Sequence, residues 1–185
     1  MNESVPLSIK VSAAEHLHMR EIAEIHRFEV LNGVSSWEAI PPDEREMNRR
    51  RKQIQSAGLP YLVAHQNDRL IGFSYASPFR PRSGYRYTVE SSIYVATDLQ
   101  RAGVGSLLMT ELIHICTKQD LRQMLAVIGD SKNSKSINFH LKLGFKKVAT
   151  LGAIGFRFDR WLDSVIMQLS LGDGRKTPPN NNFYS

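Results

Sequence analysis

One stretch of the chain, residues 86–108, constrains the fold more than any other, because it joins a strand to a helix through a short loop. Residues 87–95 are rich in β-branched and aromatic side chains, which is typical of a strand. Apolar residues recur at helical spacing over residues 107–113. The stretch therefore predicts a strand, a tight connection and a helix in immediate succession.

The connecting loop contains two glycines, Gly103 and Gly105, just before the predicted helix. The first turn of a helix has backbone N–H groups without internal partners and carries partial positive charge. Glycine has no Cβ, so an anion could approach the backbone closely at these two positions. Two interpretations stay open from these residues alone: a phosphate site, or an ordinary strand-to-helix turn.

Several longer motifs surround this loop in a fixed order. They are PFRPR at 78–82, YRYTVE at 85–90, QRAGVG at 100–105, QMLAVIGD at 123–130, SI at 136–137, His140, GF at 144–145 and RWLD at 160–163. Together, over about residues 9–171, the chain resembles the phosphinothricin / methionine sulfoximine N-acetyltransferase family of the GNAT superfamily. The resemblance implies a mixed, twisted α/β (α+β) sheet of six to seven strands flanked by about four helices. It also implies acetyl-CoA as cosubstrate, central strands that part where CoA enters, and a homodimer.

Composition fits one soluble enzyme-sized domain. At 185 residues, with 42% hydrophobic and 23% charged residues, the chain is long enough for one core, predicted over residues 1–171. Residues 172–185 contain few apolar side chains and are predicted to be a disordered tail. The only cysteine, Cys116, excludes an internal disulfide and is predicted to be a buried hydrophobe. With neither a signal pattern nor an apolar run long enough for a membrane, we expect a cytoplasmic protein.

The net charge of +6 permits a nucleic-acid partner, but part of it is one run, residues 49–52. Such a run is more typical of a solvated helix face, and a basic surface also attracts an anionic substrate. We therefore predict no nucleic-acid and no membrane partner. The six histidines lack metal-ligand spacing, and no metal is predicted.

Periodicity and turn residues divide the chain into further elements. Strands are predicted over residues 8–12, 61–64, 70–76, 87–95, 123–128, 145–150 and 161–171. Helices are predicted over residues 13–31, 41–56, 107–118 and 132–143. Loops are predicted over residues 35–38 and 78–84, and an aromatic-glycine loop over residues 154–160.

Glu90 is the candidate general base. An acid in the middle of a central strand is costly unless it is paired or faces a cleft, and burial would raise its pKa. A structural ion pair with a residue such as Arg86 is the alternative. The match of TVE at 88–90 to the family motif implies the catalytic role, with the proton lost directly or through a water molecule.

The resemblance also implies cofactor-binding and further catalytic residues. The residues expected to bind acetyl-CoA are Ile93, Tyr94, Val95, Gln100, Arg101, Ala102, Gly103, Val104, Gly105, Ser106 and Asn133. Arg101 and Ala102 depart from the family pattern, in which a glycine and an arginine are common there. His140 stands where many relatives carry a thiolate-protonating tyrosine, and it is either a proton donor or orienter, or a histidine that packs over Gly144.

The acceptor site is expected around two arginines, Arg80 and Arg82, in a proline-stiffened loop. Two guanidiniums can hold a carboxylate or phosphinyl anion, although solvated loop arginines are the alternative. Tyr85, Tyr87 and Trp37 would line the same pocket, or Trp37 would only cover the core edge.

These expectations describe an N-acetyltransferase that acts on the α-amino group of a small amino-acid-like acceptor and so detoxifies it. The alternatives are the same chemistry on a polyamine, an aminoglycoside or a protein N-terminus, or a non-catalytic module that binds CoA or nucleic acid. The two loop arginines disfavour polycationic acceptors, because like charges repel.

Overall fold

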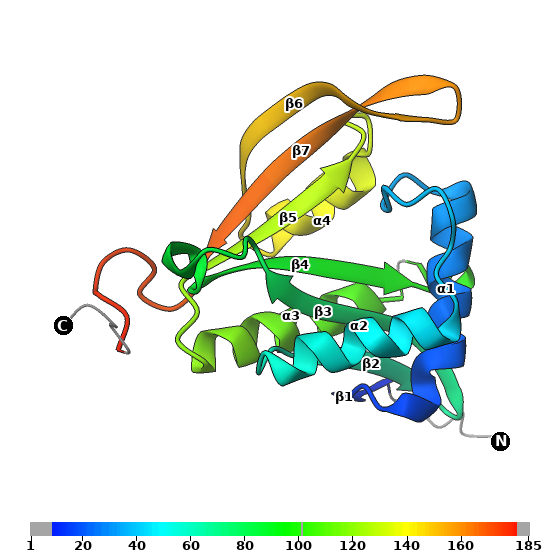
Figure 1. The fold of residues 1–185 in the computed structure, drawn as a ribbon, viewed down its shortest axis with the longest axis horizontal. Helices are drawn as coiled ribbons and strands as arrows, with labels where there is room; N and C mark the ends of the chain where they lie inside the picture. The colour runs from blue at the N-terminus through cyan, green and yellow to red at the C-terminus, as the bar shows by residue number, and fades with distance from the viewer. Residues whose placement is uncertain (1–8, 101, 181–185) are drawn as a thin grey trace, which may run out of the picture.

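The computed structural model describes residues 9–100 and 102–180. Within them, seven strands form one mixed sheet in the order β1-β2-β3-β4-β5-β7-β6 (Figure 1). The strands are β1 (Ile9–Ala13), β2 (Tyr61–Gln66), β3 (Arg69–Pro78), β4 (Thr88–Val95), β5 (Gln123–Gly129), β6 (Lys146–Arg157) and β7 (Arg160–Ser170). The described α-helices are α1 (Met19–Asn32), α2 (Glu44–Ser56), α3 (Val104–Lys118) and α4 (Ser134–Lys142). The predicted mixed α/β fold, with the TVE strand at its centre, is confirmed.

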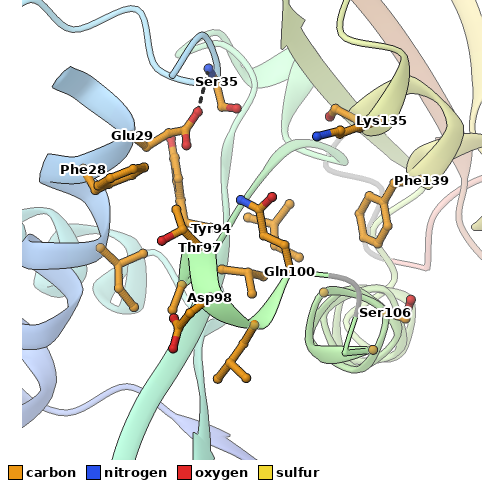
Figure 2. Close-up of a pocket in the computed structure, with 18 of the residues that line it drawn as sticks. Phe28, Glu29, Ser35, Tyr94, Thr97, Asp98, Gln100, Ser106, Lys135 and Phe139 are labelled. Atoms are coloured by element: carbon orange, nitrogen blue, oxygen red, sulfur yellow. Dashed lines mark hydrogen bonds between the residues drawn. The ribbon is translucent and has the colours of Figure 1, made fainter. Parts of the chain in front are cut away.

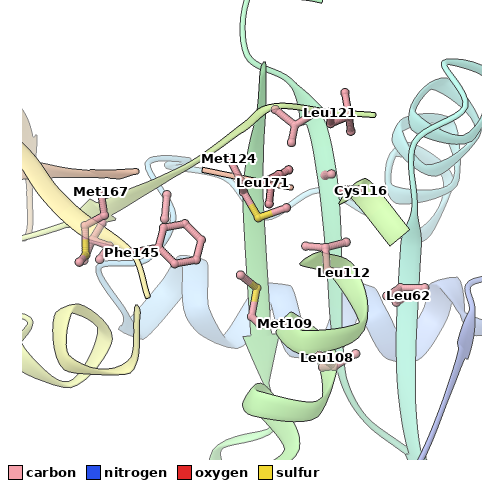
Figure 3. Packing of buried hydrophobic residues seen from close by; sticks show 14 of the residues in the cluster. Leu62, Leu108, Met109, Leu112, Cys116, Leu121, Met124, Phe145, Met167 and Leu171 are labelled. Atoms are coloured by element: carbon pink, nitrogen blue, oxygen red, sulfur yellow. The ribbon is translucent and has the colours of Figure 1, made fainter. Parts of the chain in front are cut away.

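Helices cover both faces of the sheet. Helices α1 and α2 pack with β2 and β3 around a cluster that includes Phe73 and Tyr61, whereas α3 and α4 pack on the opposite face (Figure 1). Figure 3 shows that opposite core, in which Leu112 and Met109 of α3 lie close to Met124 of β5. Cys116 is fully buried there, as predicted, and burial raises the pKa of its thiol to about 12.

The two central strands part halfway along their length. Strands β4 and β5 pair in parallel only from Thr88↔Gln123 to Ser91↔Ala126. Beyond these pairs β4 continues to Val95 along β3, and β5 continues to Gly129 along β7. The backbone of residues 92–95 therefore borders an opening in the middle of the sheet.

Two sequence predictions need correction. The second helix begins at Glu44 rather than residue 41, because Asp43 caps it by accepting a 2.8 Å hydrogen bond from the Glu46 N–H. The predicted loop over residues 154–160 is wrong, since β6 runs to Arg157 and β7 starts at Arg160. The two residues between them have positive φ, as a tight primed hairpin turn requires, although neither is glycine.

The basic run and the chain end both make intramolecular contacts. Arg50 forms a two-bond ion pair with Glu38, at 2.7 and 3.0 Å, so the run does not simply face solvent. In the segment predicted as a tail, Arg122 donates hydrogen bonds to Thr177 Oγ1 (3.1 Å) and to the Pro178 carbonyl (2.9 Å). Across the described residues, none of the helices combines the length and apolar character that a membrane span requires.

Candidate active site

A cavity of about 840 Å³ lies beside the part of β4 that no longer pairs with β5 (Figure 2). Its walls come from α1, the end of β4, the short helix η3 (Thr97–Leu99), the start of α3 and one face of α4. Most residues predicted to bind the cofactor line it: Ile93, Tyr94, Val95, Gln100, Gly103, Gly105 and Ser106. The strand, loop and helix predicted over residues 86–108 thus line the same cavity.

The loop before α3 has the geometry of an anion site. Gly103 is the residue at the helix N-cap, with φ of +83°, and no side chain caps this end. Gly105 faces the ring of Phe139 on α4, and a Cβ at this position would make van der Waals contact with that ring at 3.4 Å. The first N–H groups of α3 and the helix dipole favour a phosphate at this wall of the cavity.

Three further predicted cofactor residues, Ala102, Val104 and Asn133, are not among the residues that line the cavity, and their role stays a prediction. Ala102 is exposed on the loop, whereas Val104 is 1% exposed and belongs to the core. Asn133 caps α4, because its Oδ1 accepts a 3.2 Å hydrogen bond from the Ser136 N–H. Arg101 lies outside the described residues.

Glu90 sits where the cavity begins, although it is not one of the residues that line the cavity. It precedes Ser91, the last β4 residue that pairs with β5. Its side chain lies on the α1/α2 face, because neighbouring Val89 packs into the core on the α3 face and strand side chains alternate. Burial desolvates the carboxylate and raises its pKa above the ordinary value near 4.5. Such a carboxyl is better suited to accept a proton than a solvated one is.

His140 is buried rather than exposed on α4. It is 4% exposed, and the rings of Phe139 and Phe145 meet it edge-on at 5.1 Å each. Its Nδ1 lies 2.8 Å from the Ser136 carbonyl oxygen, which places the proton of the neutral ring on Nδ1. Burial lowers its pKa, so the neutral form, with Nε2 as an acceptor, is favoured. This arrangement fits an orienting role better than proton donation, and both remain predictions.

The predicted acceptor residues fall into two groups that the structure does not bring together. Arg80 stacks on Phe79 at 5.1 Å, and Tyr85 meets the same ring at 5.6 Å, in the loop before β4. Tyr87 ends that loop, and Arg86 lies over its ring at 4.6 Å, while Arg82 precedes the short helix η2 (Ser83–Tyr85). The group lies in the segment that leads into β4, the strand that carries Glu90.

Trp37 lies instead at the far end of β5. Its indole packs against Gly155 of β6, where a Cβ would come within 2.1 Å of the ring, and it also approaches Gly129 at the end of β5. The start of β4 pairs with the start of β5, so the group beside the start of β4 and Trp37 lie toward opposite ends of β5.

Helix α4 supplies cavity residues that the sequence predictions missed. Lys135, Asn138, Phe139 and Lys142 line the cavity, with Lys135 and Phe139 facing Gln100 in Figure 2. Their spacing of three and four residues places them on one helix face, but the spacing does not tell which face of the helix meets the cavity. Phe28 and Glu29 of α1 line the opposite wall, and Glu29 accepts a 3.2 Å hydrogen bond from the Ser35 N–H.

Comparisons with known proteins agree with this geometry. The sequence model of the Acetyltransferase (GNAT) family matches residues 20–145. The chain is 43% identical to phosphinothricin N-acetyltransferase of Alcaligenes faecalis, over 85% of this chain and 80% of that protein. It is 34% identical to an L-methionine sulfoximine/L-methionine sulfone acetyltransferase of Salmonella typhimurium, over 82% and 88% of the two chains.

A solved structure is similar over almost the whole chain. It is the GNAT superfamily phosphinothricin acetyltransferase from Sinorhizobium meliloti in complex with acetyl-CoA. Its TM-score is 0.91 at 41% identity, covering 95% of each chain. The parted sheet, the loop at the start of α3 and these matches show that the chain belongs to the GNAT acetyltransferase family. The reaction is therefore acetyl transfer from acetyl-CoA to an amine, and acetyl-CoA is the cosubstrate.

Proposed function

We propose that this enzyme acetylates the α-amino group of a small, anionic amino-acid-like acceptor of the phosphinothricin or methionine sulfoximine type. The observation that carries the proposal is the position of Glu90, a carboxyl with a raised pKa at the head of a cleft whose other end offers an anion site. The names of the relatives support the acceptor class. Acetylation removes the charge of the ammonium, which supports a role in detoxification.

Glu90 accepts the proton that an ammonium must lose before it can attack, either directly or through a water molecule. Bound acetyl-CoA supplies the acetyl carbonyl and a thiolate leaving group. Backbone N–H groups near Ile93, Tyr94 and Val95 polarise the thioester oxygen. As the N–C bond forms and the C–S bond breaks, one proton passes to Glu90 and one reaches the thiolate, with His140 as its donor or orienter.

Arg80 and Arg82 bind the acceptor's carboxylate or phosphinyl group, and Tyr85 and Tyr87 line the same region. Their loop leads into the strand that carries Glu90, which supports this role, because the α-amino and acidic groups of an amino acid are only a few bonds apart. The same charges disfavour polyamines and aminoglycosides as acceptors. Trp37 is not assigned to this region, because it packs against Gly155 and against Gly129 at the far end of β5.

A homodimer and a cytoplasmic location complete the proposal. The edge hairpin β6–β7 exposes Phe156 (56%), Phe158 (49%) and Trp161 (65%), which supports a second copy of this chain as its cover. Light scattering on a sizing column tests the dimer. Dependence on acetyl-CoA, a cytoplasmic metabolite, supports the location.

A thiol-release assay with acetyl-CoA tests the reaction and the acceptor together. The panel contains phosphinothricin, methionine sulfoximine, methionine sulfone, common amino acids, spermidine and an N-terminal peptide, with wild type and Glu90→Gln side by side. We expect turnover only on the anionic amino acids and a sharp loss in the variant. Turnover on spermidine or the peptide alone would refute the acceptor class.

A further inference from the structure

The connection between α1 and α2 spans the opening between the parted strands. We refer to residues 33–38 as the cleft loop. Ser35 lines the cavity, and the Val34 carbonyl oxygen packs so closely on Gly129 that a Cβ there would lie only 1.9 Å from it. Gly129 is the last residue of β5, so the cleft loop rests on the end of this strand.

The hairpin β6–β7 holds this loop through one guanidinium. Arg157, the last residue of β6, donates hydrogen bonds to the carbonyl oxygens of Val30, near the C-terminal end of α1, and of Ser36 in the cleft loop. The guanidinium also lies 4.7 Å over the ring of Phe158, which fixes its plane. Because the guanidinium is planar and rigid, its two hydrogen bonds fix the position of Val30 and Ser36 relative to the hairpin.

Two further contacts make the attachment specific. The indole of Trp37 occupies the space over Gly155, two residues before Arg157 on the same strand. At the loop's end, Glu38 forms its ion pair with Arg50 of α2, so α2 fixes that end independently. The hairpin therefore holds Ser36 and Trp37, whereas α2 holds Glu38 at the end of the loop.

We propose that Arg157 is a positioning residue for the acceptor, acting by holding the cleft loop as the wall of the cleft on the α1/α2 face. The proposal rests on the proposed function. Glu90 lies on that same face, whereas α3 and α4, on the other, carry the anion site and the cavity lysines. The amine thus approaches Glu90 from the face on which the cleft loop lies. The anion site at the start of α3 lies on the opposite face, although Ser35 of the loop lines the same cavity.

Steady-state kinetics of Arg157→Met test this assignment. Arg160→Met is the matched control, because Arg160 faces Arg157 across the same hairpin but pairs with Asp130 at 2.7 Å instead. We expect KM for the anionic acceptor to rise at least tenfold in Arg157→Met, with KM for acetyl-CoA within twofold of wild type. Arg157→Lys, which keeps a cationic donor, should recover part of the loss, and Arg160→Met should change neither value. An unchanged acceptor KM, an equal rise in both KM values, or the same effect in Arg160→Met would overturn the proposal.

Amide hydrogen exchange gives a readout that does not need turnover. In Arg157→Met, peptides spanning residues 30–38 should exchange at least tenfold faster, while peptides of α3 keep their wild-type rates. Trp37→Leu should raise the acceptor KM as well, and the double variant should be less impaired than the product of the two effects, because both act on one loop. If wild type turned over no acceptor, the proposed function would fail, and unchanged exchange at residues 30–38 would separately overturn the role of Arg157.

Discussion

Replacing Glu90 with glutamine should slow the enzyme and stabilise it at the same time. The variant keeps the shape of the side chain but cannot accept a proton, so kcat should fall by about 10²–10⁴-fold. Burial raises the pKa of Glu90 because it disfavours the charged form. At neutral pH the partly buried carboxylate therefore lowers the free energy of unfolding. Glutamine carries no charge and does not lower it in this way.

The sign and size of the stability change follow from proton linkage. Because the folded-state pKa lies above the unfolded value near 4.5, the folded state binds more protons in this window, and stability falls as pH rises through the folded pKa. Each pKa unit corresponds to about 1.4 kcal/mol. For a chain of this length that is a Tm shift of about 3–5 °C per unit. Remaining solvent contact of Glu90 makes this an upper bound.

Paired measurements across pH test both halves of the prediction. Thermal unfolding at pH 7.5 should give a higher Tm for Glu90→Gln than for wild type, and the difference should shrink toward pH 4.5. The wild-type kcat should rise with pH as Glu90 loses its proton. In Glu90→Gln this rise of kcat with pH should be absent. A lower Tm in Glu90→Gln at neutral pH would refute the reasoning and favour the structural ion pair as the role of Glu90.

Three other substitutions probe separate parts of the molecule. Gly103→Ala places a Cβ at φ +83°, which costs roughly 1–2 kcal/mol, and it should raise KM for acetyl-CoA; an unchanged KM would argue against the anion site. Phe145→Ala should lower the free energy of unfolding by about 3–5 kcal/mol in urea titrations, since Phe145 is 2% exposed; a loss below about 1 kcal/mol would contradict its core position. Arg122→Met should release residues 177–180 to limited proteolysis with kcat unchanged, and equal protection would show that Arg122 does not hold them.

Local pattern was enough to predict most of the fold. The strand-loop-helix of residues 86–108 appeared as β4, the loop and α3, because β-branched residues, two glycines and a helical apolar stripe agree there. Both strands of the hairpin β6–β7 were predicted, but residues 154–160 were predicted as a loop, and that error has a tertiary reason. Gly155 looked like a loop residue, yet it is a strand glycine whose missing side chain makes room for Trp37, over a hundred residues earlier.

The site was predictable only where one segment forms it. Residues of β4 and of the loop before α3 were found together, since they are adjacent in sequence. The cavity face of α4 and the contact of Arg157 with the cleft loop depend on how separate elements pack. The pKa of Glu90 likewise depends on burial, which no local motif specifies.

The packing of Trp37 on Gly155 also constrains how such chains can diverge. Among relatives, residues at these two positions should change together, because a smaller side chain at position 37 leaves space for a Cβ at position 155. Position 129 should behave differently. The group against Gly129 is the Val34 main-chain carbonyl, which no substitution removes, so glycine should persist there whatever residue stands at position 34.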